Sequence, residues 1–117
     1  MRATLADRLV HIRQAITHIH DLTNIWSDAE LLSDPVRRAA LERFVEVVSE
    51  ASRYIPDDVR GRYADIPWLK IRNIGNILRH GYDAVTFETL LLIARTEIYD
   101  LERAILLIIA EDEDGDA

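Results

Sequence analysis

Polar side chains suited to phosphate chemistry recur at helical spacing in the second half of the chain. Asn73, Asn76 and His80 stand at i, i+3 and i+7, and therefore share one face of a helix. Arg72 flanks this stripe, and Arg79 immediately precedes the histidine. Arginine and asparagine donate hydrogen bonds to phosphate oxygens, and a histidine can take a proton from a ribose 2′-hydroxyl. The stripe therefore indicates anion binding combined with proton transfer.

Two neighbouring residues extend this pattern. Gly75 lies inside the same helix, where glycine costs about 1 kcal/mol relative to alanine, so we expect another backbone or a ligand to come close to it. Tyr82, just past the expected end of the helix, is placed to stack on a base or to donate to a phosphate. The alternative interpretation is that the polar stripe is the solvent-facing side of an ordinary bundle helix.

A second group of titratable residues lies near the N-terminus. His11 and His18 share a helix face with Asp7, Gln14 and Asp21. Imidazole and carboxylate are suitable zinc ligands, but a gap of seven residues puts the two rings roughly 10 Å apart, too far for one ion. We expect an exposed polar face here, and we predict no metal and no cofactor. The sequence contains no phosphate-binding glycine loop, serine triad or zinc signature.

Four long helical patterns and a short helical turn must position these residues, and no segment predicts a strand. Each long pattern has a recognisable start: Thr4, Asp34–Pro35, Asp65–Pro67 and Thr86. Gly81 is the expected stop of the third, residues 57–63 are the short turn, and residues 22–33 are expected to be the longest irregular piece. Apolar residues recur in steps of four and three, as in helices packed at a shallow angle. The sequence therefore predicts an all-α, four- to five-helix antiparallel bundle.

Composition sets limits on the class of protein. The chain has 117 residues, enough for one domain, which we assign to residues 1–110. The net charge of -7 comes mostly from residues 111–117, an acidic tail with five acids that we expect to be solvated and frayed. Such a charge argues against strong non-specific nucleic-acid binding but allows a local basic cleft. The chain has no cysteine, no apolar leader and an apolar stretch broken by charges, so we expect a cytoplasmic protein with no membrane span.

The segment Ile66-Pro-Trp-Leu-Lys-Ile-Arg, followed by Gly75-Asn-x-Leu-Arg-His-x-Tyr82, resembles the signature region of the HepT-like branch of the HEPN superfamily. The likeness extends to residues 42–55, where Ser49-Glu50-Ala51 stands in place of the Gly-Glu-Ala that the family often has, and to the closing helix. It covers most of the chain from about Pro35 onward.

This resemblance implies a helical bundle that homodimerises and brings two copies of the motif together across one cleft. Family members are typically metal-independent endoribonucleases that act as toxins, and the neighbouring antitoxin is typically a minimal nucleotidyltransferase of the MntA type. The antitoxin silences such toxins by attaching AMP (AMPylation) to the motif tyrosine, which here would be Tyr82. The motif histidine matches His80, and the polar residue four before it matches Asn76.

One departure from the family pattern concerns the motif arginine, because Gly75 stands where arginine is more common. Arg72, Arg79 or a guanidinium from a second subunit would have to replace it. Our first hypothesis is therefore an endoribonuclease toxin of a type VII-like toxin–antitoxin pair, in which His80 is the base, Arg72 or Arg79 stabilises charge on phosphorus, and Asn73 and Asn76 bind substrate. The alternative is a non-catalytic nucleotide- or protein-binding module that partners a nucleotidyltransferase. A purely structural dimer is the third possibility.

Overall fold

The computed structural model describes the backbone of residues 4–80 and 84–115 and the side chains of residues 4–80 and 87–112. These ranges are helical and contain no strand, so the predicted all-α class is confirmed. The elements are α1 (Leu5–Ile25), α2 (Asp28–Ser33), α3 (Pro35–Ser52), α4 (Asp57–Gly61), α5 (Trp68–Arg79), α6 (Ala84–Leu92), the π-helical turn η1 (Ile93–Glu97) and α7 (Ile98–Gly115).

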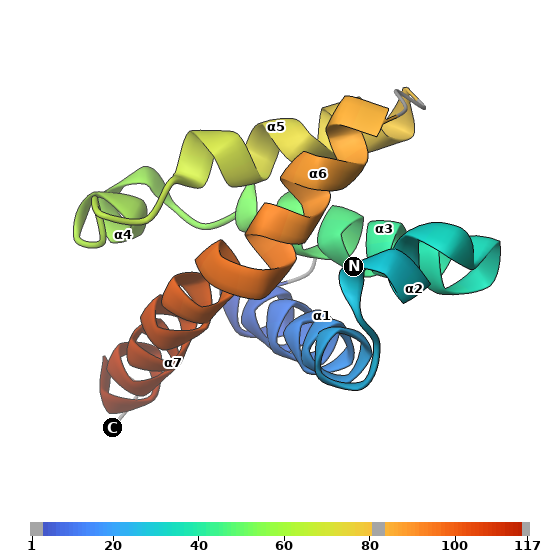
Figure 1. Cartoon of the computed structure of the whole chain (residues 1–117). Helices are drawn as coiled ribbons and strands as arrows, with labels where there is room; N and C mark the ends of the chain where they lie inside the picture. Colours follow the sequence, from blue (N-terminus) through green and yellow to red (C-terminus); the bar gives the residue numbers. More distant parts are fainter. Residues whose placement is uncertain (1–3, 81–83, 116–117) are drawn as a thin grey trace.

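Helix α3 lies in the middle of the molecule and packs against α1 on one side and α5 on the other, while the α6–η1–α7 segment crosses in front of them (Figure 1). The core between these helices is made almost entirely of branched aliphatic side chains. Those that are almost fully buried include Leu9, Ile12, Ile16, Ile19, Leu41, Val45, Val48, Ile71, Ile74, Leu90, Ile93, Ile98, Leu101 and Ile105. The aliphatic stripes read from the sequence therefore form the core, as predicted.

Helices α1 and α3 begin where the sequence predicted. Thr4 and Asp7 exchange hydrogen bonds in a capping box, and these bonds hold the pKa of the Asp7 carboxyl below its ordinary value. Asp34 accepts from the backbone N–H of Val36 at 2.9 Å, and Pro35 occupies the first position of α3. Both starts follow from local side-chain chemistry alone.

The expectation of an irregular segment over residues 22–33 is wrong. Helix α1 continues to Ile25, and α2 follows after Ser27, whose hydroxyl accepts from the backbone N–H of Glu30. The Glu30 carboxylate returns a bond to the Ser27 N–H, so the pair forms a second capping box. The Ser-x-x-Glu spacing carries this signal in the sequence.

The predicted start of the last helix at Thr86 is wrong, because Ala84 and Val85 are already helical and Thr86 lies inside α6. The helix is then interrupted by η1, a wider turn that the apolar rhythm did not reveal. Arg95 of this turn donates to the backbone carbonyls of Thr23 at 2.8 Å and Trp26 at 2.9 Å, and it pairs with Asp28. Its guanidinium thus satisfies carbonyls at the end of α1 that have no partner within the helix.

Helix α7 runs into the acidic segment as far as Gly115, and the expected fraying does not hold at Glu111. The Tyr63 hydroxyl donates to this carboxylate at 2.7 Å, and Arg62 donates to it at 2.9 Å. The hydrogen bond from Tyr63, together with Arg62, keeps the pKa of Glu111 low, and the same bond raises the pKa of Tyr63. Within the described ranges, no helix combines the length and apolarity that crossing a bilayer requires.

Replacing Arg95 with alanine is expected to lower the free energy of unfolding by about 1–3 kcal/mol, because two carbonyls of α1 lose their donor. Arg103→Ala is the matched control, since Arg103 is exposed and, among the described residues, its one ion pair is with Asp100 on its own helix. Its effect should stay within about 0.5 kcal/mol. Urea unfolding followed by circular dichroism measures both. Equal effects of the two variants would contradict the role assigned to Arg95.

Candidate functional site

The polar residues singled out in the sequence lie on the outer face of α5. The opposite face holds Ile71 and Ile74, which are buried in the core, and Gly75, which is buried against α3. The outward residues are half-buried Asn76 and exposed Arg72, Asn73, Arg79 and His80. The amphipathic pattern alone is enough to place them outside the core of the subunit.

Asn76 and Arg79 are brought together by a residue of another helix. The Arg79 guanidinium pairs with the carboxylate of Glu50 on α3 and also donates to the side-chain oxygen of Asn76. Sequence reasoning did not assign Glu50 to the site, although it lies in the Ser49-Glu50-Ala51 segment that resembles the family. Because this carboxylate compensates the charge of Arg79, a phosphate would have to compete with it for the guanidinium.

Arg72 and Asn73 take different positions from this pair. The backbone carbonyl of Arg72 accepts from the Ser49 hydroxyl at 3.0 Å, while its side chain is exposed and none of the described carboxylates pairs with it. Asn73 lies about 60° around the helix axis from Asn76 and lines a groove between α5 and α6, with Lys70 and Ile77. Among the described residues, the structure therefore leaves the Arg72 guanidinium without a carboxylate partner on this face, and it sets Asn73 at the edge that faces α6.

His80 closes α5 as its C-terminal cap, and its backbone N–H donates to the carbonyls of Asn76 at 3.3 Å and Ile77 at 3.2 Å. Its side chain is exposed and directly follows Arg79. Gly81, the predicted stop, and Tyr82, the predicted site of modification, lie outside the described residues. The helix thus ends at the position that the sequence predicted, with the imidazole on the surface.

Gly75 marks a close approach, but the group that comes near it is a side chain rather than a backbone or a ligand. Its N–H donates to the Ser49 hydroxyl at 3.1 Å, and a Cβ added to Gly75 would stand 2.9 Å from Ser49 Cβ and even closer to the hydroxyl oxygen. An arginine therefore does not fit at position 75 while Ser49 is present. Ser49 itself stands where the family often has glycine, so the two departures from the family pattern touch each other.

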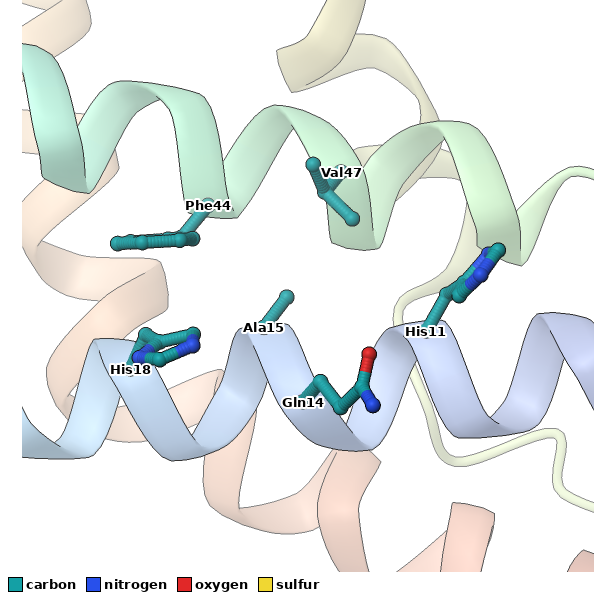
Figure 2. A pocket seen from close by; sticks show the side chains of 6 residues that line it. All are labelled: His11, Gln14, Ala15, His18, Phe44 and Val47. Atoms are coloured by element: carbon teal, nitrogen blue, oxygen red, sulfur yellow. The ribbon is translucent and has the colours of Figure 1, made fainter.

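The second group of candidate residues lies on the seam between α1 and α3, and Figure 2 shows it from close by. His11, Gln14 and His18 of α1 are exposed, as expected, and together with Ala15, Phe44 and Val47 they line a groove of about 230 Å³. The His18 ring stacks on Phe44 with ring centres 4.6 Å apart. Among the described residues, no three histidine, aspartate or glutamate side chains are grouped closely enough to hold a metal ion.

Comparisons with known proteins agree on one family. The family profile "Ribonuclease HepT-like" matches residues 12–108. The protein named "Putative RNase MJ0127" of Methanocaldococcus jannaschii is 30% identical over 119 residues, which cover 98% of this chain and 95% of that protein. "Probable ribonuclease HepT" of Thermococcus cleftensis is 28% identical over 102 residues, covering 87% and 93%. "Putative RNase MJ1380" of M. jannaschii is 25% identical over 100 residues, covering 86% and 92%.

No solved structure matches the chain at a significant level. The family profile spans most of the sequence, including the whole of α3 and α5, and the curated relatives match over nearly their full lengths. The chain belongs to the HepT-like ribonuclease family of the HEPN superfamily.

Proposed function

We propose that this protein is a metal-independent endoribonuclease, the toxin of a type VII-like toxin–antitoxin pair, which cuts RNA in a cleft between the α5 helices of a homodimer. Membership of a family described as ribonucleases supports the reaction class. The observation that carries the proposal is the outer face of α5, where an exposed imidazole, an amide and an uncompensated guanidinium share one surface: His80, Asn76 and Arg72.

In the proposed reaction, His80 takes the proton from a ribose 2′-hydroxyl as that oxygen attacks the adjacent phosphorus. The bond from phosphorus to the 5′ oxygen breaks, the leaving oxygen takes up a proton from water, and His80 returns the proton it took to the solvent. The product keeps a 2′,3′-cyclic phosphate. Charge that builds on the phosphoryl oxygens needs a guanidinium nearby. No step of this reaction calls for a metal ion or another cofactor.

Arg72 is the better candidate for the charge-stabilising role, because Glu50 already pairs with Arg79. Arg72 lies about 12 Å along the axis from His80, with Asn76 midway between them. If two α5 helices cross antiparallel near Asn76, a two-fold axis sets Arg72 of one subunit opposite the partner's His80. Arg79 would then hold Asn76 in place to orient the phosphate, and Asn73 would contact the substrate at the edge facing α6.

Exposed apolar residues beside the polar face of α5 support a dimer. Leu69 is 68% exposed and Ile77 is 37% exposed, and both line the groove of about 480 Å³ between α5 and α6. Exposed apolar side chains that line one groove fit an interface between subunits better than apolar side chains scattered singly over a surface. A second copy of the chain covering it would also bring the two polar faces together.

The proposed partner of the toxin is an MntA-like nucleotidyltransferase antitoxin, in the cytoplasm, acting on Tyr82. Tyr82 follows His80 by only two residues. AMP attached to its hydroxyl would add a phosphate and a base two residues from His80 in the sequence, and is proposed to exclude RNA in this way. This part of the proposal rests on the family resemblance.

A second candidate function is a non-catalytic module that binds nucleotides or a nucleotidyltransferase. The observation that favours it is the buried contact between Gly75 and Ser49, which leaves no room for the motif arginine. The compensation of Arg79 by Glu50 points in the same direction. Activity measurements separate the two functions.

The purified chain is expected to cleave labelled single-stranded RNA in the presence of EDTA and to leave cyclic phosphate ends. His80→Ala should slow cleavage by about 10² or more, because a general base contributes roughly 10²–10⁴ to the rate. His20→Ala is the control, since His20 faces α7 and pairs with Glu102. Cleavage by His80→Ala at the parent rate, or loss of parent activity in EDTA, would refute the proposed mechanism.

A second experiment tests the contact between Ser49 and Gly75. Gly75→Arg alone should destabilise the fold by about 1–3 kcal/mol, because it overpacks the interface between α3 and α5. Adding Ser49→Gly should restore part of this loss, with a coupling energy above about 1 kcal/mol, and should raise the cleavage rate by supplying the motif arginine.

Urea unfolding of the parent, both single variants and the double variant gives the coupling energy, and RNA cleavage by the same four proteins gives the rates. If the destabilisation of the double variant equals the sum of the changes in the two single variants, removal of the Ser49 side chain does not make room for an arginine at position 75. A coupled but inactive double variant would favour the non-catalytic module.

A further inference from the structure

The groove between α1 and α3 is a mixed aromatic and polar surface that the proposed reaction does not use. Figure 2 shows the His18 and Phe44 rings parallel at one end, His11 at the other, and Ala15 between them. The two rings are inclined by only 22°. Val47 of α3 closes the upper side, and Gln14 of α1 contributes an amide. The groove thus has an apolar floor and hydrogen-bonding groups along its rim.

The lining residues define the chemistry of a ligand. Two imidazoles and an amide offer both donors and acceptors, and no lysine or arginine is among the lining residues. A phosphate would find no guanidinium or ammonium there, whereas an uncharged, flat heterocycle would match the groove. The volume of about 230 Å³ is smaller than the roughly 300–1,000 Å³ of pockets for drug-sized ligands, and so suits a single ring system.

Helix α3 contributes residues both to the groove and to the contacts of the polar face of α5. Val47 lines the groove, and Glu50, which binds Arg79, follows three residues later. Three residues of a helix correspond to about 4.5 Å along its axis and about 60° around it. The groove and the ion pair that holds Arg79 therefore lie on neighbouring surfaces of α3.

We propose that the groove holds one nucleobase of the single-stranded RNA whose phosphate lies on α5. The base lies flat against Ala15 and Val47, meets the edge of the His18–Phe44 pair, and presents its polar edge to Gln14 and His11. This inference rests on the proposed function for its ligand, but it concerns binding and not cleavage. Single-stranded RNA is commonly recognised through its unstacked bases, and in this groove the aromatic pair meets the base by its edge.

The test is binding of a fluorescent 2′-O-methyl RNA hexamer, which has no free 2′-hydroxyl to react, measured by anisotropy. Stacking of a base on an aromatic ring is worth about 1–3 kcal/mol, and an edge contact is expected to lie at the low end, so His18→Ala is expected to weaken binding roughly fivefold to tenfold. The matched control is His20→Ala on the same helix, because His20 stacks on Tyr99 and bonds to Glu102 on α7, away from the groove. Its affinity should equal that of the parent, with folding of each variant checked by circular dichroism.

A set of hexamers with one abasic position each shows whether a base is the group recognised. For one of these abasic hexamers, the affinity for the parent protein is expected to equal the affinity of the intact hexamer for His18→Ala. The same abasic hexamer is expected to bind His18→Ala no more weakly than it binds the parent. Equal binding of the intact hexamer to the parent and His18→Ala would overturn the inference. So would independent, additive losses at every abasic position, or a His18→Ala variant that changes only the oligomeric state or the binding of a protein partner.

The two proposals can fail separately. If the parent binds the hexamer through the groove but cleaves no RNA, the nuclease proposal falls and the base site remains. If cleavage depends on His80 while His18→Ala leaves both the KM for RNA and hexamer affinity unchanged, the base site falls alone. If both hold, His18→Ala raises KM while the rate at saturating RNA stays within about twofold of the parent.

Discussion

The close approach of α3 and α5 through Ser49 and Gly75 is the contact on which the rest of the site depends. The Ser49 hydroxyl donates to the carbonyl of Arg72 and accepts from the N–H of Gly75. One buried side chain thus binds the backbone of α5 at two positions. Without a Cβ at Gly75 the helices come close enough for Glu50 to reach Arg79. The same contact leaves no space for an arginine at position 75. The guanidinium of the proposed phosphate site therefore has to come from another residue.

Much of the fold follows from local chemistry that a sequence displays. Thr4 and Asp34 cap helices through their own side chains, and the aliphatic rhythm identifies the buried faces because a helix repeats every 3.6 residues. The second capping box, at Ser27, displays the same kind of signal in its Ser-x-x-Glu spacing. The π-helical turn at Ile93–Glu97 could not be read in this way, since Arg95 acts there on carbonyls of α1 that are distant in sequence.

The candidate site, too, was only partly predictable from the sequence. The outward face of α5 was predictable, because periodicity separates Asn76 and His80 from the apolar residues of one helix. The ion pair between Glu50 and Arg79 was not, since it depends on how two helices pack. The His11–His18 face was expected to be an exposed polar surface, and only the packing of Phe44 and Val47 against α1 shows that it forms a groove.

The proposed cleft requires two α5 helices that face each other, and the distance between them can be measured directly. The chain has no cysteine, so a spin label on Leu69→Cys, next to the polar face of α5, would be the only label in each subunit. Double electron–electron resonance should give a short and narrow distance between the labels of two subunits, and a clearly longer one for Arg103→Cys on α7. Absence of any intersubunit distance at position 69, or a distance as long as at position 103, would contradict a shared cleft between α5 helices.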